Sequence, residues 1–261
     1  MITPKKIYSK KSKHEKITVL TAYDFPFASI LDQSGIDVIL VGDSLGMVVL
    51  GHETTLPVTM QDMIHHTQAA SRGVKTALLV GDMPYKSYLN PAMAVKNAKL
   101  LIKAGARAVK LEGGKKNQKQ IQSLVKAKIS VMGHLGMTPQ SVKEFGGYRV
   151  QGREPKQAEA ILQEAVLLDK LGVFAIVLEC VPSALAEKIT KAVNCPTIGI
   201  GAGSSVDGQV LVLHDLLGFK SNVKPRFVRR YANLDEEIRR AVSEYRSDVL
   251  SGHFPLKEES Y

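Results

Sequence analysis

Acidic side chains follow several of the short apolar runs in this 261-residue chain. In the stretch DVILVGDSLG, Asp43 and Ser44 come directly after a run of valine, isoleucine and leucine and one glycine. Five further polar side chains end comparable runs: Asp82, Lys110, Glu112, His134 and Glu179. A single carboxylate at such a position is as well explained by a helix N-cap or a turn. The repetition of the pattern indicates a shared site.

Carboxylates that gather at one place indicate that a cation is bound there. Like charges repel and raise one another's pKa, so a positive charge should offset them. Oxygen ligands without a nearby pair of cysteines or histidines favour Mg²⁺ over zinc. A substrate such as an α-keto acid could bind the cation through its own oxygens. The cation would then stabilise the enolate that forms when a proton leaves the carbon beside the carbonyl.

Glu179 is the predicted general base, because it follows an apolar run and its carboxylate would be partly desolvated. Lys110 alternates with Glu112, so both side chains could face the same way. Lys110 could bind the substrate carboxylate or stabilise the enolate oxygen, or it could form an ion pair with Glu112 or Asp82. His134 could donate a hydrogen bond to the substrate or be a satisfied histidine at a strand end. Spacing alone does not separate these alternatives.

The elements that must position these residues are eight apolar runs separated by helix-like segments. The predicted strands are 17–23, 37–43, 76–82, 107–113, 129–135, 174–180, 196–202 and 209–215. Continuous apolar runs are typical of parallel strands covered by helices. Segments 57–73, 90–106 and 154–172 carry proline near the start and glycine at or near the end, as helices do. The pattern predicts a (β/α)8 TIM barrel, one domain over residues 1–261, with every strand's carboxyl end on one face.

Composition and charge bear on whether the protein binds nucleic acid, spans a membrane or is secreted. The net charge of +10 is compatible with nucleic-acid binding, but no aromatic residues are interleaved with the lysine and arginine clusters. The sequence does not show whether the basic segment over residues 1–15 is ordered. This segment lacks the apolar core of a signal peptide. No apolar run approaches the ~20 residues of a membrane helix. We therefore expect a cytoplasmic protein that binds neither membrane nor nucleic acid, with Cys180 and Cys195 as free thiols.

Seven strings along the chain resemble the ketopantoate hydroxymethyltransferase family. They occur in the family's order and at compatible spacing between about residue 16 and beyond residue 220. The strings are TAYDFPFA, VGDSLGMVVLGHETTLPVT, GDMPY, VKLEGG, GHLGMTPQSVKEFGGYRVQGR, VLECVP and IGIGAGSSVDGQVLVLHDLLG.

The resemblance implies a (β/α)8 barrel enzyme of pantothenate and coenzyme A biosynthesis. Its substrates would be small molecules: 5,10-methylenetetrahydrofolate would donate a one-carbon unit to 3-methyl-2-oxobutanoate, giving 2-dehydropantoate and tetrahydrofolate. By the family pattern, Asp43, Asp82 and Glu112 would hold Mg²⁺, and Glu179 would be the base. The implied contacts to the keto acid are Asp43, Ser44, Asp82 and Lys110, with His134 as a further candidate. Family members form decamers, so we expect a homo-oligomer.

Two alternatives remain beside this interpretation. One is a Mg²⁺-dependent lyase of the phosphoenolpyruvate mutase and isocitrate lyase type, although the Lys-Cys-Gly-His-like loop usual there is absent from this sequence. The other is a basic nucleic-acid-binding protein, in which acidic side chains at the barrel mouth would repel the ligand. The glycine-bearing segment 136–153 is predicted to be a lid, with an oligomer contact or a plain surface loop as alternatives.

Overall fold

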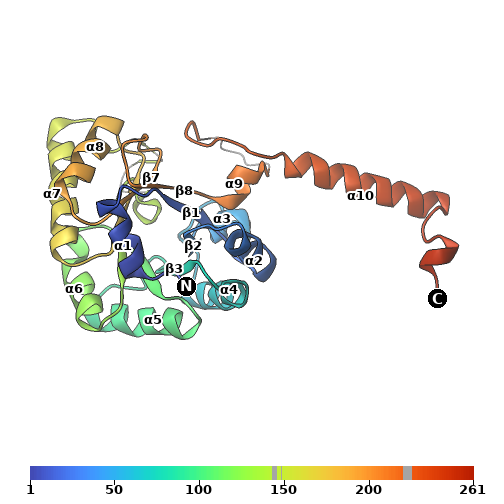
Figure 1. Cartoon of the computed structure of the whole chain (residues 1–261), viewed down its shortest axis with the longest axis horizontal. Helices are drawn as coiled ribbons and strands as arrows, with labels where there is room; N and C mark the ends of the chain where they lie inside the picture. Colours follow the sequence, from blue (N-terminus) through green and yellow to red (C-terminus); the bar gives the residue numbers. More distant parts are fainter. Residues whose placement is uncertain (143–145, 148, 220–224) are drawn as a thin grey trace. The chain divides into compact units, whose positions relative to one another are not determined.

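The computed structural model describes residues 1–142, 146–147, 149–219 and 225–261. Eight parallel strands close into a barrel in sequence order, with helices around them (Figure 1). The strands are β1 (Ile17–Thr21), β2 (Val38–Val41), β3 (Leu78–Asp82), β4 (Ala108–Glu112), β5 (Val131–Gly136), β6 (Ala175–Glu179), β7 (Thr197–Ile200) and β8 (Gly208–Leu211). The helices are α1 (Pro4–Ser12), α2 (Phe25–Gln33), α3 (Leu45–Val48), α4 (Met60–Gly73), α5 (Pro91–Lys103), α6 (Gln118–Lys126), α7 (Pro155–Lys170), α8 (Ser183–Ala192), α9 (Leu213–Leu217) and α10 (Leu234–Ser251). The predicted (β/α)8 barrel is confirmed.

The predicted elements match the observed ones except near the end of the barrel. Helices α4, α5 and α7 occupy the three segments predicted as helices. Strand β8 ends at Leu211 and helix α9 begins at Leu213, so the strand predicted over 209–215 is wrong in its second half. The apolar run continues through this change of structure, which is why its composition did not reveal the boundary. Residues 143–145 and 148 of the predicted lid lie outside the described residues.

The N-terminal segment, whose order the sequence left open, forms helix α1 at the amino end of the barrel. Thr3 caps the helix by accepting a hydrogen bond from the Lys6 N–H, and Pro4 begins it. Ile7 is fully buried in a cluster with residues of the barrel interior, among them Ile17 and Val38. Burial of a side chain of this size contributes about 1.5–3 kcal/mol, enough to help hold a short helix in place.

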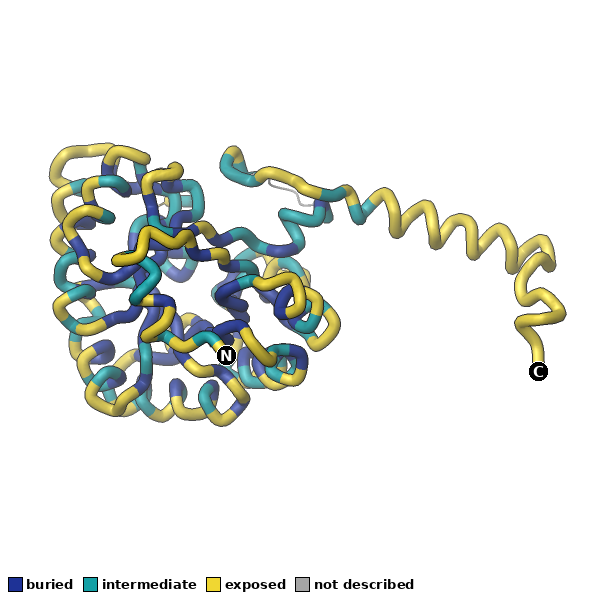
Figure 2. Tube along the Cα trace, in the orientation of Figure 1, coloured by how far each residue is buried: buried dark blue, intermediate teal, exposed yellow. Residues whose placement is uncertain are grey.

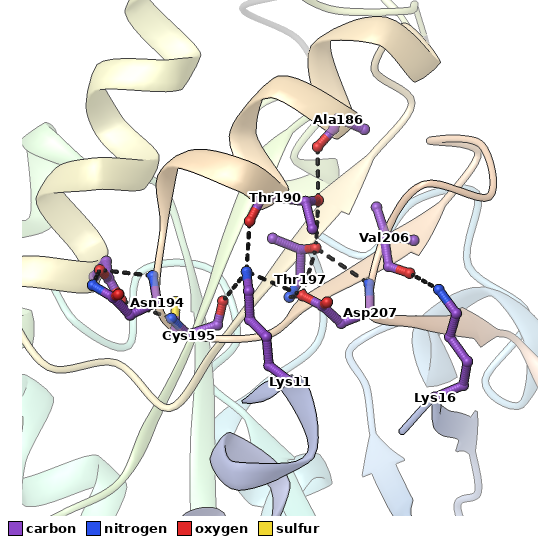
Figure 3. Close-up of polar contacts among 10 residues, drawn as sticks. Lys11, Lys16, Ala186, Thr190, Asn194, Cys195, Thr197, Val206 and Asp207 are labelled. Atoms are coloured by element: carbon purple, nitrogen blue, oxygen red, sulfur yellow. Dashed lines mark hydrogen bonds and ion pairs between the residues drawn. The ribbon is translucent and has the colours of Figure 1, made fainter. Parts of the chain in front are cut away.

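Lysines of this segment are used in contacts within the molecule. Lys10 Nζ lies 2.7 Å from Asp37 Oδ1, and Lys11 Nζ lies 3.3 Å from Asp207 Oδ2. Lys11 also donates to the carbonyl oxygens of Thr190 and Cys195, as Figure 3 shows. Asp37 and Asp207 each precede a strand, so these contacts fasten α1 across the amino ends of the barrel. Lys10 and Lys11 of the basic segment therefore have a structural role.

The chain divides into two compact units, residues Met1–Val212 and Leu213–Tyr261. The first unit contains the whole barrel. In the second, α10 is exposed from Glu236 to Ser251 (Figure 2). Its exposed residues include the apolar Ile238, Val242, Tyr245 and Val249. Among the described residues, no helix has the length and apolar character needed to cross a membrane.

Asp32 joins helix α2 to the start of β3. Its carboxylate accepts hydrogen bonds from the backbone N–H groups of Lys75, Thr76 and Ala77, at 3.1, 2.9 and 2.7 Å. Burial alone would raise the pKa of Asp32, but these hydrogen bonds outweigh it and lower the pKa. A carboxylate with a lowered folded-state pKa stabilises the fold fully above its unfolded-state pKa. That contribution is lost as the pH falls through the folded-state pKa.

Replacing Asp32 by asparagine is therefore expected to lower the free energy of unfolding by about 1–3 kcal/mol at pH 7. The difference from the wild type should shrink as the pH falls below about 4, where the wild-type carboxylate also becomes protonated. Urea unfolding of both proteins at several pH values measures this. Asp24→Asn on the same helix is the control, because asparagine caps a helix as well as aspartate does. A difference for Asp32→Asn that does not vary with pH would contradict the account.

Candidate active site

The predicted site residues lie at the carboxyl ends of neighbouring strands. Asp43 follows β2, Asp82 ends β3 and Glu179 ends β6. Lys110 and Glu112 belong to β4, and His134 belongs to β5. These strands pair in register, so Asp82 lies opposite Lys110 and Glu112 lies opposite His134. Side chains distant in sequence thereby meet at one face of the barrel, where enzymes of this architecture carry out their chemistry.

One half of the cluster is formed by Asp43, Asp82 and Lys110. Lys110 Nζ donates to Asp82 Oδ2 at 2.5 Å, and Asp82 Oδ2 also lies 3.4 Å from the Asp43 backbone nitrogen. Burial, together with the facing carboxylates, raises the pKa of Asp43 well above its ordinary value. Burial also raises the pKa of Asp82, against the effect of Lys110. For Lys110, burial is outweighed by the surrounding carboxylates, so its pKa is raised and it is a cation at neutral pH.

The other half is a row of Glu112, His134 and Glu179. His134 Nδ1 lies 3.5 Å from Glu112 Oε1, and its Nε2 lies 3.1 Å from Glu179 Oε2. Both contacts are within ion-pair distance, although neither is aligned as a hydrogen bond. Burial and the charge of Lys110 oppose protonation of His134, but the two carboxylates outweigh them and raise its pKa to about 9. The ring therefore lies between two carboxylates that favour its protonated form.

Gln140 connects the two halves. Its side-chain Nε2 donates to Asp43 Oδ2 at 2.8 Å, and its backbone N–H donates to Glu112 Oε2 at 3.0 Å. Its Oε1 accepts a hydrogen bond from the Tyr88 hydroxyl at 2.5 Å. Neither residue is predicted from the sequence. An amide in a loop and a tyrosine beyond a strand end carry no periodic or charge signal that would mark them as site residues. Gln140 also lies in segment 136–153, for which the sequence predicted only a lid.

Ser44 and Glu179 are the more accessible parts of the site. Ser44 is half-buried, and its Oγ lies 2.8 Å from the Tyr23 hydroxyl. The Glu179 side chain is 16% exposed, whereas that of His134 beside it is 2% exposed. The partly desolvated position expected for Glu179 is what the structure shows. A substrate approaching from solvent would therefore meet Glu179 before it reaches the buried carboxylates.

The donor chemistry of the cluster fits a hard divalent cation. Asp82 Oδ1 and Glu112 Oε1 are buried and accept no hydrogen bond, and an added cation would relieve the repulsion that raises the pKa of Asp43 and Asp82. As the side chains lie, no group of three or more His, Cys, Asp or Glu residues in the described part of the chain is arranged to hold a metal ion. Lys110 and Gln140 occupy one oxygen each of Asp82 and Asp43. Assignment of Mg²⁺ to Asp43, Asp82 and Glu112 therefore stays a prediction.

Comparison with known proteins identifies the family. The family model for ketopantoate hydroxymethyltransferase matches residues 1–257. The chain belongs to this family. A 3-methyl-2-oxobutanoate hydroxymethyltransferase of Caldicellulosiruptor saccharolyticus is 52% identical over 261 residues, which cover 100% of this chain and 99% of the relative. The enzyme of the same name from Syntrophus aciditrophicus is 51% identical, covering 100% of this chain and 96% of that relative. The resemblance seen in the seven strings is thereby confirmed.

Solved structures show how widely this fold is shared beyond the ketopantoate hydroxymethyltransferase family. A phosphoenolpyruvate phosphomutase from Streptomyces platensis subsp. rosaceus superposes with a TM-score of 0.65, covering 96% of this chain and 88% of that one. Its sequence is 11% identical, so the likeness concerns the fold alone. The lyase alternative considered for the sequence therefore shares the architecture, whereas membership of the hydroxymethyltransferase family separates this chain from it.

Proposed function

We propose that this member of the ketopantoate hydroxymethyltransferase family transfers a hydroxymethyl group from 5,10-methylenetetrahydrofolate to 3-methyl-2-oxobutanoate. Water supplies the hydroxyl group, and the products are 2-dehydropantoate and tetrahydrofolate. The observation that carries the proposal is the convergence of Asp43, Asp82, Lys110, Glu112, His134 and Glu179 at one barrel face, in a chain that matches the family over residues 1–257. The family's use of folate agrees with a one-carbon donor of this kind.

Glu179 takes the proton from C3 of the keto acid in this mechanism. Its carboxylate is partly accessible and ends β6, so an apolar strand holds it at the barrel mouth. His134, whose Nε2 lies 3.1 Å away, positions that carboxylate from the buried side. Loss of the C3 proton gives an enolate, whose carbon then attacks the one-carbon unit of the folate.

Lys110, together with a cation held by the three carboxylates, would stabilise the negative charge that develops on the keto acid. Asp43, Asp82 and Glu112 would hold Mg²⁺, which supplies Lewis-acid stabilisation of the enolate oxygen when bound. The Lys110 ammonium, already fixed against Asp82, would contact the substrate carboxylate or the enolate oxygen. Ser44, half-buried beside Asp43, would donate a hydrogen bond to the same substrate.

Product formation tests the proposal. The full chain is incubated with Mg²⁺, 3-methyl-2-oxobutanoate and ¹³C-labelled 5,10-methylenetetrahydrofolate, and mass spectrometry measures labelled 2-dehydropantoate. We expect product only when all components are present. The matched control substrate is 3,3-dimethyl-2-oxobutanoate, which has no C3 proton and should give none. Absence of labelled product from the complete mixture would contradict the proposal.

We further propose a homo-oligomer in the cytoplasm, decameric as the family resemblance implies. The exposed apolar side chains of α10 support association, because a contiguous apolar helix face is costly to leave in water. The mass of the full chain by light scattering decides this, and a monomeric mass would contradict it.

A further inference from the structure

We propose that Gln140 is a positioning residue for the cation site, holding the carboxylates of Asp43 and Glu112 in place for a divalent ion. The inference rests on the proposed function, because that function assigns the cation to Asp43, Asp82 and Glu112. Gln140 follows β5, whereas the two carboxylates it contacts come from the ends of β2 and β4. It therefore links two predicted cation ligands that belong to separate strands.

Gln140 makes hydrogen bonds through its side-chain N–H₂ group, its backbone N–H and its side-chain oxygen. The side-chain N–H₂ group donates to Asp43 Oδ2 at 2.8 Å and to the Met83 carbonyl oxygen at 3.0 Å. The backbone N–H donates to Glu112 Oε2 at 3.0 Å. The side-chain oxygen accepts from Tyr88. With 7% of its surface exposed, Gln140 has its amide fixed at both ends rather than free to rotate in solvent.

Tyr88 holds the other end of the amide. The Asp43 carboxylate and the Met83 carbonyl can only accept, so they face the N–H₂ group, and the Tyr88 hydroxyl donates to Gln140 Oε1 on the opposite side. Tyr88 is itself 9% exposed, and its backbone carbonyl accepts a hydrogen bond from Gln120. The orientation of the Asp43 carboxylate thus depends on a chain of buried hydrogen bonds that begins outside the cluster.

An amide suits this position better than a second cation would. Gln140 binds one oxygen of Asp43 and one of Glu112 without neutralising either carboxylate, and Glu112 Oε1 still accepts no hydrogen bond. The negative charge needed to attract a divalent ion is therefore kept, while the side chains lose the freedom to move apart under mutual repulsion. Hydrogen-bond partners of metal ligands typically account for ~10- to 100-fold in metal affinity.

The test measures Mn²⁺ binding by the full chain in the absence of substrate, using the electron paramagnetic resonance signal of free Mn²⁺. Gln140→Met keeps the length of the side chain and removes its hydrogen bonds. We expect its dissociation constant for Mn²⁺ to rise by ~10- to 100-fold over the wild type. Tyr88→Phe removes a single hydroxyl and should raise the dissociation constant in the same direction by a smaller factor. It also keeps the proposal testable if Gln140→Met fails to fold.

Thr197→Val is the matched control, since Thr197 is fully buried and its hydroxyl donates to the carboxylate of Asp207 at the amino end of the barrel rather than to a carboxylate of the cluster. It should lower the melting temperature as Gln140→Met does, yet bind Mn²⁺ as the wild type does. Unchanged affinity in both Gln140→Met and Tyr88→Phe would overturn the proposal while leaving the cation site intact. If the wild type binds no Mn²⁺, or if Asp82→Asn binds it equally well, the cation site of the proposed function fails instead.

Discussion

Replacing Glu179 by glutamine is expected to slow hydrogen exchange at C3 of 3-methyl-2-oxobutanoate by ~10²- to 10⁴-fold, the usual contribution of a general base. Glutamine has the shape of glutamate but cannot take the proton. Its side-chain oxygen can keep the contact with His134 Nε2, which lies 3.1 Å from Glu179 Oε2 in the wild type. Exchange is followed by proton NMR in D₂O with Mg²⁺ present.

Two comparisons make this result specific to the base. Mn²⁺ binding should change by less than ~2-fold in Glu179→Gln, because Glu179 is outside the carboxylates assigned to the cation. Glu159→Gln makes the same chemical change on the surface of α7, where Glu159 contacts Lys188, and should exchange at the wild-type rate. Exchange in Glu179→Gln at more than half the wild-type rate would show that another group removes the proton.

The second large effect is expected for Asp82→Asn. This change removes a predicted cation ligand and leaves the buried Lys110 ammonium without the carboxylate to which it donates at 2.5 Å. Loss of a residue that hydrogen-bonds to a metal ligand already lowers metal affinity by ~10- to 100-fold. Loss of the ligand itself should therefore weaken Mn²⁺ binding by more than ~100-fold. The apparent affinity for the keto acid should fall as well, because the displaced Lys110 no longer faces the substrate correctly.

Asp37→Asn is the matched control for that experiment. Asp37 is also buried and paired with a lysine, Lys10 at 2.7 Å, but it lies at the amino end of the barrel. The variant should lose stability and keep wild-type affinity for Mn²⁺ and for the keto acid. Equal binding of Mn²⁺ by Asp82→Asn and the wild type would contradict the assignment of Asp82 to the cation.

The sequence predicted the barrel and most of the cluster because both follow from local patterns. The strands are dominated by apolar residues, and Asp82 and Glu179 end two of them without a spacer. Closure of the parallel strands into a barrel then brings their carboxyl ends together. The strand predicted over 209–215 was too long because the apolar run continues into α9, where composition does not distinguish strand from helix.

Residues that act through contacts distant in sequence could not be predicted in this way. Lys11 resembles part of a solvated basic tail, yet its ammonium group binds the carbonyl oxygens of Thr190 and Cys195. Gln140 lies 97 positions from Asp43 and has neither charge nor periodicity to mark it. The two interpretations of Lys110 were also inseparable by spacing, and the structure shows its ion pair with Asp82, while its contact with substrate stays a prediction.

The measurement that most directly tests the central claim is loss of the C3 proton signal of 3-methyl-2-oxobutanoate in D₂O, recorded with Mg²⁺, with a chelator, and with or without tetrahydrofolate. Enolate formation by Glu179 at a cation site of Asp43, Asp82 and Glu112 predicts that the signal disappears with Mg²⁺ and persists with the chelator. Persistence of the signal in folded protein with both Mg²⁺ and tetrahydrofolate present would contradict that chemistry.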